Sequence, residues 1–223
     1  MDSTIKFYLS LSIIFAVIIG IVRYRRINTS YYPFIYNVCL VLIVEILGNV
    51  LMAQGDGKMF TTLLNIFSLL DFCLFTWLFH NWGLFNRRKD VFISILIIFV
   101  VAWILITLVF NNITTPNFYF RIGYSFFLIF FSVNTFNKVV VHERGRISRN
   151  PKFLICLGII VFYTFFVLVC ATNLSVLRTS VTKLFRASMQ EINVYSNLLV
   201  NILYAVAVLW IPRKQNFMTP FSS

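Results

Sequence analysis

Seven long apolar segments dominate the sequence and constrain its fold more than any other feature. Each approaches the roughly 20 residues that an α-helix needs to cross the hydrocarbon core of a bilayer. That core offers no water to backbone N–H and C=O groups, so spanning segments are expected to be helical. The segments cover residues 5–22, 31–54, 60–80, 91–110, 117–141, 153–171 and 193–211. We therefore predict an all-α fold in which residues 1–223 form a single transmembrane domain, a bundle of about seven helices.

Composition argues against the main alternatives to this fold. The chain is 60% hydrophobic and 12% charged, and its mean hydropathy is +0.87. Soluble domains carry about 25% charged residues because their surfaces are hydrated, so a soluble core would not hide this many apolar side chains. A transmembrane β-barrel would alternate apolar and polar residues in segments of about ten, and the sequence has no such stretch.

The positions of the basic residues predict an orientation. They gather at the ends of the apolar segments, where such residues contact lipid headgroups and stay on the cytoplasmic side. The connections after the first, third and fifth segments, together with the tail, hold thirteen of the 19 Lys and Arg residues: Arg23, Arg25, Arg26, Arg87, Arg88, Lys89, Lys138, Arg144, Arg146, Arg149, Lys152, Arg213 and Lys214. The other side holds six: Lys6, Lys58, Arg121, Arg178, Lys183 and Arg186.

This charge distribution predicts an N-terminus outside and a C-terminus in the cytoplasm. The net charge of +12 is therefore interpreted as membrane topology, with the lipid bilayer as partner and no nucleic acid. We expect a multi-pass protein of the bacterial cytoplasmic (inner) membrane.

Catalytic, cofactor and metal motifs are missing from the sequence. Cys39, Cys73, Cys156 and Cys170 all fall within predicted spans without a Cys-x-x-Cys pair, and they are interpreted as small apolar residues. Two distant histidines do not make a zinc site. The last span has no lysine for retinal, and no Gly-x-Ser-x-Gly occurs. We predict no enzyme activity, no catalytic residues, no cofactor and no metal.

Residues 172–192 allow two interpretations. Apolar side chains recur there at every third or fourth position, while Arg178, Lys183 and Arg186 lie on other faces. Such a pattern is typical of an amphipathic helix lying in the membrane interface. It would equally suit an extension of the sixth or seventh span, and the sequence does not choose between them.

Ionisable residues within the spans are the candidate functional groups. Such residues cost about 2.5–3.5 kcal/mol each on insertion scales, so they face other helices or water. Glu45, Asp71 and Arg121 lie in the second, third and fifth spans, and polar residues repeat beside them at helical spacing. The candidate intramembrane polar cluster comprises Glu45, Asn49, Asn65, Asp71, Arg121, Tyr124, Asn197 and Asn201.

Three interpretations of this polar cluster stay open. In the first, the cluster forms hydrogen bonds and one ion pair that hold helices together. In the second, it forms an outward-facing pocket for a small ligand or ion. In the third, one of its carboxylates handles protons. Arg121 is able to approach either Glu45 or Asp71 in this topology. We expect Asp71→Asn to be tolerated for folding, whereas Asp71→Lys is not.

The chain resembles a family of small bacterial membrane proteins with seven predicted helices, for which no activity is established. The resemblance covers most of the chain and rests on short motifs: Glu45-Ile-Leu-Gly-Asn49, Asn65-Ile-Phe, Asp71-Phe72, the run 151–163, and Asn201-Ile-Leu-Tyr204. Members more often have Glu than Asp in the third helix, so Asp71 keeps the charge and shortens its reach. The resemblance implies the topology and no particular function.

Our functional expectation is a non-catalytic membrane protein, a sensory or accessory component that relays a signal to a membrane or cytoplasmic protein partner. The basic connection 142–152 is a candidate docking segment for that partner. The alternative is a transporter of a small solute or ion that uses the Glu45, Asp71 and Arg121 group. A more remote alternative is an intramembrane enzyme. The small-molecule ligand is unknown.

Overall fold

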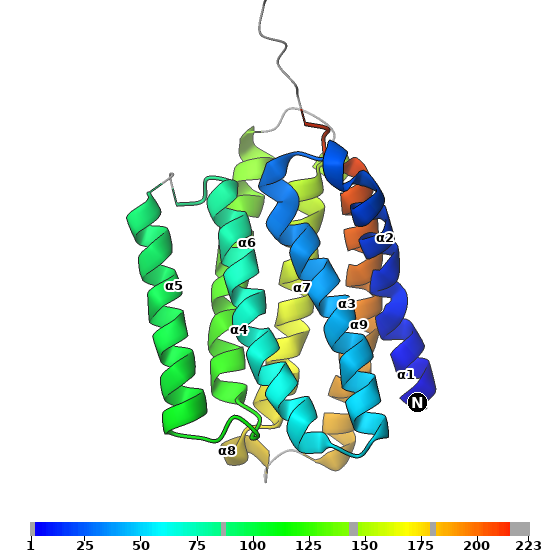
Figure 1. Ribbon diagram of the computed structural model, residues 1–223, viewed down its shortest axis with the longest axis vertical. Helices are drawn as coiled ribbons and strands as arrows, with labels where there is room; N and C mark the ends of the chain where they lie inside the picture. Colours follow the sequence, from blue (N-terminus) through cyan, green and yellow to red (C-terminus); the bar gives the residue numbers. More distant parts are fainter. Residues whose placement is uncertain (1–2, 86–87, 143–146, 179–181, 215–223) are drawn as a thin grey trace, which may run out of the picture.

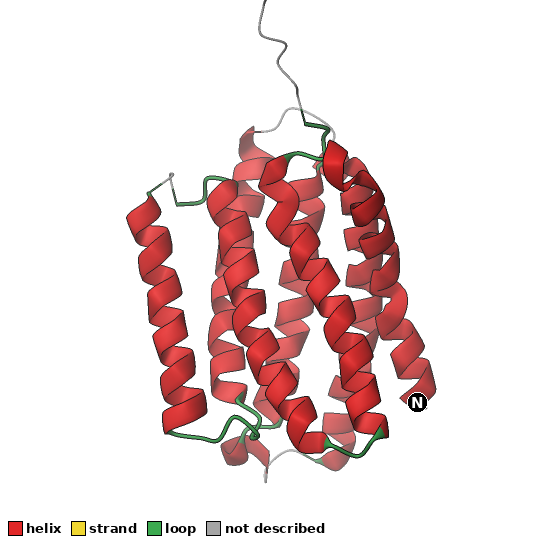
Figure 2. Ribbon diagram, viewed as in Figure 1, coloured by secondary structure: helices red, strands yellow, loops and turns green. Residues whose placement is uncertain are grey.

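The computed structural model describes residues 3–85, 88–142, 147–178 and 182–214. These residues are helical apart from short connections (Figure 2). The α-helices are α1 (Ser3–Ser10), α2 (Ile14–Arg23), α3 (Tyr32–Ala53), α4 (Gly57–Asn81), α5 (Lys89–Ile104), α6 (Phe118–His142), α7 (Pro151–Thr172), α8 (Ser175–Arg178) and α9 (Lys183–Trp210). A 3-10 turn at Leu11–Ile13 joins α1 to α2, and a π-helical turn at Leu105–Val109 extends α5.

Seven of these helical stretches are long and apolar enough to cross a membrane, as a multi-pass membrane protein requires. They are Phe7–Arg26, Thr29–Ala53, Gly57–Asn81, Lys89–Val109, Phe118–Val141, Pro151–Thr172 and Lys183–Trp210. They alternate in direction along one bundle axis (Figure 1). We call the end where α2, α4, α6 and α9 finish the basic end, and the other the opposite end.

Local sequence signals account for the helix boundaries. Asn150 accepts hydrogen bonds from the backbone N–H groups of Lys152 and Phe153, and Pro151 occupies the first turn of α7, where its missing N–H has no cost. Asp56 caps α4 in the same way. Before it, Gly55 adopts φ 76°, a conformation that glycine reaches without steric strain.

The last spanning helix begins well before the predicted segment. Helix α9 starts at Lys183, where Thr182 accepts a hydrogen bond from the backbone N–H of Phe185. Residues 183–192 therefore extend the seventh span, and the short helix α8 precedes them. The sequence left this choice open because the segment is amphipathic, and an amphipathic pattern suits either arrangement.

Helix α7 lies between α6 and α9 and makes its main contacts with these two helices. Helix α3 packs against α4, and α2 packs against α9, so the first and last spans are neighbours. Helix α5 lies at one edge of the bundle beside α4 (Figure 1). Large apolar side chains such as Phe15, Ile98 and Phe130 point outward, and each is 63% exposed. This exposure is expected for a surface solvated by lipid tails.

Arg23 joins the first span to the end of the last one. Its guanidinium donates to the carbonyl oxygens of Val208 at 2.7 Å and Ile211 at 3.1 Å, and also to that of Leu209. The last carbonyls of a helix lack partners within the helix and attract a cation. Arg23 therefore has a structural role in addition to its place in the basic end.

We expect Arg23→Gln to lower the stability of the purified protein by about 1–3 kcal/mol, because partly buried carbonyls at the end of the last span lose charge-assisted hydrogen bonds. Arg25→Gln is the matched control, since the Arg25 side chain is exposed and makes no such contact with α9. Thermal unfolding in detergent measures the difference. Equal melting temperatures for the two variants would contradict this role of Arg23.

Candidate functional site

A cavity of about 230 Å³ lies within the bundle between α3, α4, α6, α7 and α9. Its walls combine apolar and aromatic side chains with a few polar groups, the usual composition of a small-molecule site. Helices α3 and α4 contribute the polar residues Asn37, Glu45, Ser68 and Asp71. Helices α6, α7 and α9 contribute Arg121, Tyr124, Tyr163, Asn193, Asn197 and Asn201.

Asp71 lies at the middle of α4 and is 2% exposed. Its Oδ1 accepts a hydrogen bond of 2.7 Å from Asn37 Nδ2, and its Oδ2 accepts one from the Tyr163 hydroxyl. Asn37 and Tyr163 come from α3 and α7, so the carboxyl group joins three helices. These two bonds orient Asp71 at the cavity wall and leave it without a cationic partner among the described residues.

Arg121 lies in the first turn of α6 and is 8% exposed. Its Nη2 donates to Asn65 Oδ1 at 3.1 Å, and its buried Nε has no hydrogen-bond partner. In the described part of the chain, Arg121 forms no ion pair with Glu45 or Asp71. The ion pair considered from the sequence is therefore not part of this structure, because Asn65 holds the guanidinium instead.

Asn65 organises the connection between α5 and α6. Its Nδ2 donates to the carbonyl oxygens of Ile113 at 2.7 Å and Thr115 at 2.8 Å, and its own carbonyl accepts from Trp103 Nε1 at 2.9 Å. Asn65 is fully buried and lies outside the cavity lining. We interpret it as the residue that positions Arg121.

The asparagines of α9 divide into two groups. Asn201 donates to the Ser12 hydroxyl at 2.9 Å and to the Ser10 carbonyl at 3.3 Å, which joins α9 to the 3-10 turn of the first span. Asn193 and Asn197 line the cavity, and the buried Oδ1 of Asn193 has no hydrogen-bond partner. A buried oxygen without a partner is uncommon and indicates water or a ligand.

A second hollow, of about 450 Å³, adjoins the cavity toward the opposite end. The two share Val44, Glu45, Leu64, Asn193 and Asn197 as lining residues. Asn49 lines the second hollow but not the cavity, and its side chain is exposed. Glu45 therefore lies on the wall that the two spaces share.

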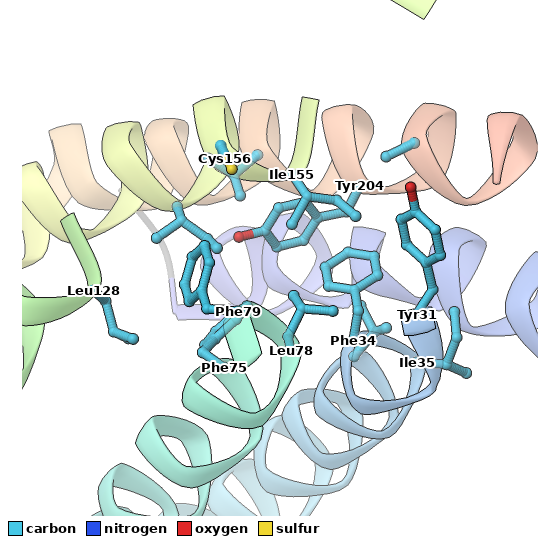
Figure 3. Close-up of a cluster of buried hydrophobic side chains, with 14 of the residues drawn as sticks. Tyr31, Phe34, Ile35, Phe75, Leu78, Phe79, Leu128, Ile155, Cys156 and Tyr204 are labelled. Carbon is cyan, nitrogen blue, oxygen red and sulfur yellow. The ribbon is translucent and has the colours of Figure 1, made fainter. Parts of the chain in front are cut away.

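An aromatic plug, comprising Phe34, Phe75, Phe79 and Tyr204, closes the cavity toward the basic end. Figure 3 shows these rings packed together against Ile155 and Cys156 of α7. The rings of Phe34 and Tyr204 meet edge to face, with centroids 5.0 Å apart. Phe34 and Phe79 are fully buried, while Phe75 and Tyr204 line the cavity itself.

The structure brings most of the predicted polar cluster to one place. Glu45, Asp71, Arg121, Tyr124, Asn197 and Asn201 line the cavity, Asn65 supports it from behind, and Asn49 lies in the adjoining hollow. Sequence reasoning missed Asn37 and Tyr163 as members of the lining. An asparagine at position 37, within an apolar span, was a usable signal for burial against a polar partner.

Metal binding gains no support from the described residues, among which no group of three or more His, Cys, Asp or Glu side chains converges. The four cysteines are free thiols. Comparisons of the chain with models of protein families, with curated proteins and with solved structures find no match.

Proposed function

We propose that this chain is a non-catalytic membrane receptor that binds a small solute in its intramembrane cavity and relays that binding to a protein partner. One observation carries the proposal: Asp71, Arg121 and Asn193 present polar groups to a single cavity without pairing with one another. Polar groups buried without mutual partners are costly in a bilayer. A bound solute would offset that cost.

The distribution of positive charge supports an outward-facing site. If the basic end lies in the cytoplasm, as the positive-inside rule predicts, the adjoining hollow faces the outside. In a bacterial cytoplasmic membrane, the solute would then reach Glu45 first and Asp71 deeper in the bundle. The partner would dock on the cytoplasmic basic end.

The aromatic plug favours reception over transport. A solute that crossed the protein would have to separate Phe34 from Tyr204, and both rings are buried between helices. Interiors packed in this way are bistable and do not deform gradually. The transporter alternative keeps one supporting observation, since Asp71 and Asn37 lie beside the plug at the deep end of the cavity.

Cysteine accessibility tests the direction of access. In a variant whose four native cysteines are replaced by alanine, we introduce Asn197→Cys and treat right-side-out vesicles with a membrane-impermeant thiol reagent. We expect Asn197→Cys to react, because its position lines both spaces. The matched control is Leu128→Cys, fully buried and outside the cavity lining, which should stay unmodified.

Reconstituted vesicles then separate the two functions. A receptor should bind a solute that raises its melting temperature and should show no solute or proton flux. An unreactive cysteine at position 197 would contradict outward access. Solute or proton flux that is lost in Asp71→Asn would support the transporter function and contradict the receptor function.

A further inference from the structure

We infer that the cavity takes a small zwitterion, with its carboxylate bound at Arg121 and its ammonium group at Asp71. This inference rests on the proposed function, because it names the chemical class of the solute. It follows from the two poles of the cavity, whose charged groups are opposite in sign, held apart by the protein, and not paired with each other.

The Arg121 pole is prepared for an anion. Asn65 holds one end of the guanidinium through Nη2, and Asn65 is itself fixed by two bonds to the connection before α6. In the described part of the chain, the buried Nε has no hydrogen-bond partner. A buried guanidinium N–H without a partner is a charge-assisted donor for a carboxylate oxygen. The neutral Asn65 leaves its positive charge uncompensated.

The Asp71 pole is prepared for a cation. Asn37 and Tyr163 orient the carboxyl group and carry no charge that would balance it. Tyr163, which bonds Asp71, belongs to a group of aromatic rings: its ring centroid lies 5.8 Å from that of Tyr124 and 6.2 Å from that of Phe75. Aromatic faces attract ammonium groups, and quaternary ones in particular. The pole therefore suits a primary or a methylated amine.

The spacing of the two poles limits the distance between the charged groups of the solute. Asn65, which holds Arg121, and Asp71 are six residues apart on α4, which corresponds to about 9 Å along a helix axis. Hydrogen bonds of about 3 Å at each end leave at least about 3 Å between the charged groups of the solute. An ammonium nitrogen and a carboxylate oxygen three or more bonds apart span this distance, as in amino acids and short betaines. The cavity of about 230 Å³ suits molecules of this size.

The test measures binding of defined probes to the purified full-length protein by calorimetry and thermal shift. The zwitterionic probes are alanine, γ-aminobutyrate and glycine betaine; tetramethylammonium lacks the carboxylate, and propionate lacks the amine. At least one zwitterion should bind, and should bind about tenfold or more weakly to Arg121→Gln and to Asp71→Asn, the usual loss for a charge-assisted hydrogen bond. Arg149→Gln, an exposed cation outside the cavity, is the control and should bind as the wild type does.

The single-charge probe tells which pole acts on which group. Tetramethylammonium binding should weaken in Asp71→Asn and stay unchanged in Arg121→Gln. If Arg121→Gln does not fold, Arg121→Lys keeps the positive charge without the planar guanidinium. This variant should weaken binding of the zwitterion and leave tetramethylammonium binding unchanged.

Two results would overturn the inference: equal zwitterion affinity in wild type and Arg121→Gln, or no binding of any zwitterion. The second result leaves the proposed function standing if the cysteine at position 197 is accessible and an uncharged solute binds in the cavity. An inaccessible cysteine would remove the proposed function itself.

Discussion

Gly158→Ala is expected to destabilise the bundle strongly, because α7 approaches Tyr204 of α9 too closely to admit a side chain. A Cβ atom at position 158 would lie 2.4 Å from Cε1 of the Tyr204 ring, well inside any van der Waals contact. The ring has little room to move, since it packs edge to face on the buried Phe34 (Figure 3). Overpacking of this kind costs about 1–3 kcal/mol, and more when the backbone has to shift.

Gly123→Ala is the matched control for that change. Gly123 lies within α6, and a Cβ atom there would meet no atom within 4 Å. Alanine is the better helix former by about 1 kcal/mol, so this variant should be as stable as the wild type or more stable. Thermal unfolding in one detergent compares them. A Gly158→Ala protein that melts at or above the Gly123→Ala temperature would show that α7 and α9 lie farther apart than in this structure.

Asp71→Lys is expected to abolish accumulation of folded protein in the membrane. The longer side chain would bring an ammonium group to a site where Asn37 Nδ2 and the Tyr163 hydroxyl both donate. Two donors would then face a cation, and a buried charge without a partner costs about 3–5 kcal/mol. That cost is a large fraction of the free energy of unfolding of an ordinary domain, about 5–15 kcal/mol. Quantified expression and gel filtration in detergent measure the effect.

Asp71→Asn provides the comparison of equal size. The asparagine Oδ1 still accepts from Asn37, and its Nδ2 is able to donate to the Tyr163 oxygen, so folding should persist with a small loss. The two variants thus separate burial of the side chain from its charge. Equal amounts of monodisperse protein for Asp71→Lys and Asp71→Asn would contradict the burial of position 71.

The apolar segments predicted the helical architecture well because helix formation in lipid is a local requirement. Each span satisfies its own backbone hydrogen bonds, so length and hydropathy are enough to find it. The start of α9 at Lys183 was harder to locate. An amphipathic stretch at a membrane surface has the same sequence pattern whether or not it continues into a span.

Hydropathy and helical spacing predicted which polar residues lie in the spans, and not which of them form hydrogen bonds with one another. Asp71 and Arg121 stood out because charged residues in a span need polar surroundings. Opposite charges suggested an ion pair, yet Arg121 binds Asn65 and Asp71 binds Asn37 and Tyr163. Hydropathy carries no information on which helix neighbours which, so no rule of spacing would have found these partners.

The sequence by itself determined the helical spans, the concentration of positive charge at one end of the bundle, and the presence of costly polar residues within the spans. These properties depend on composition and on spacing along one helix, which the chain carries locally. Only the tertiary structure decided that α7 lies between α6 and α9, that Arg23 binds the end of α9, and that a cavity separates Asp71 from Arg121. Those outcomes depend on contacts between helices far apart in the chain, where the shape of each interface selects the neighbour.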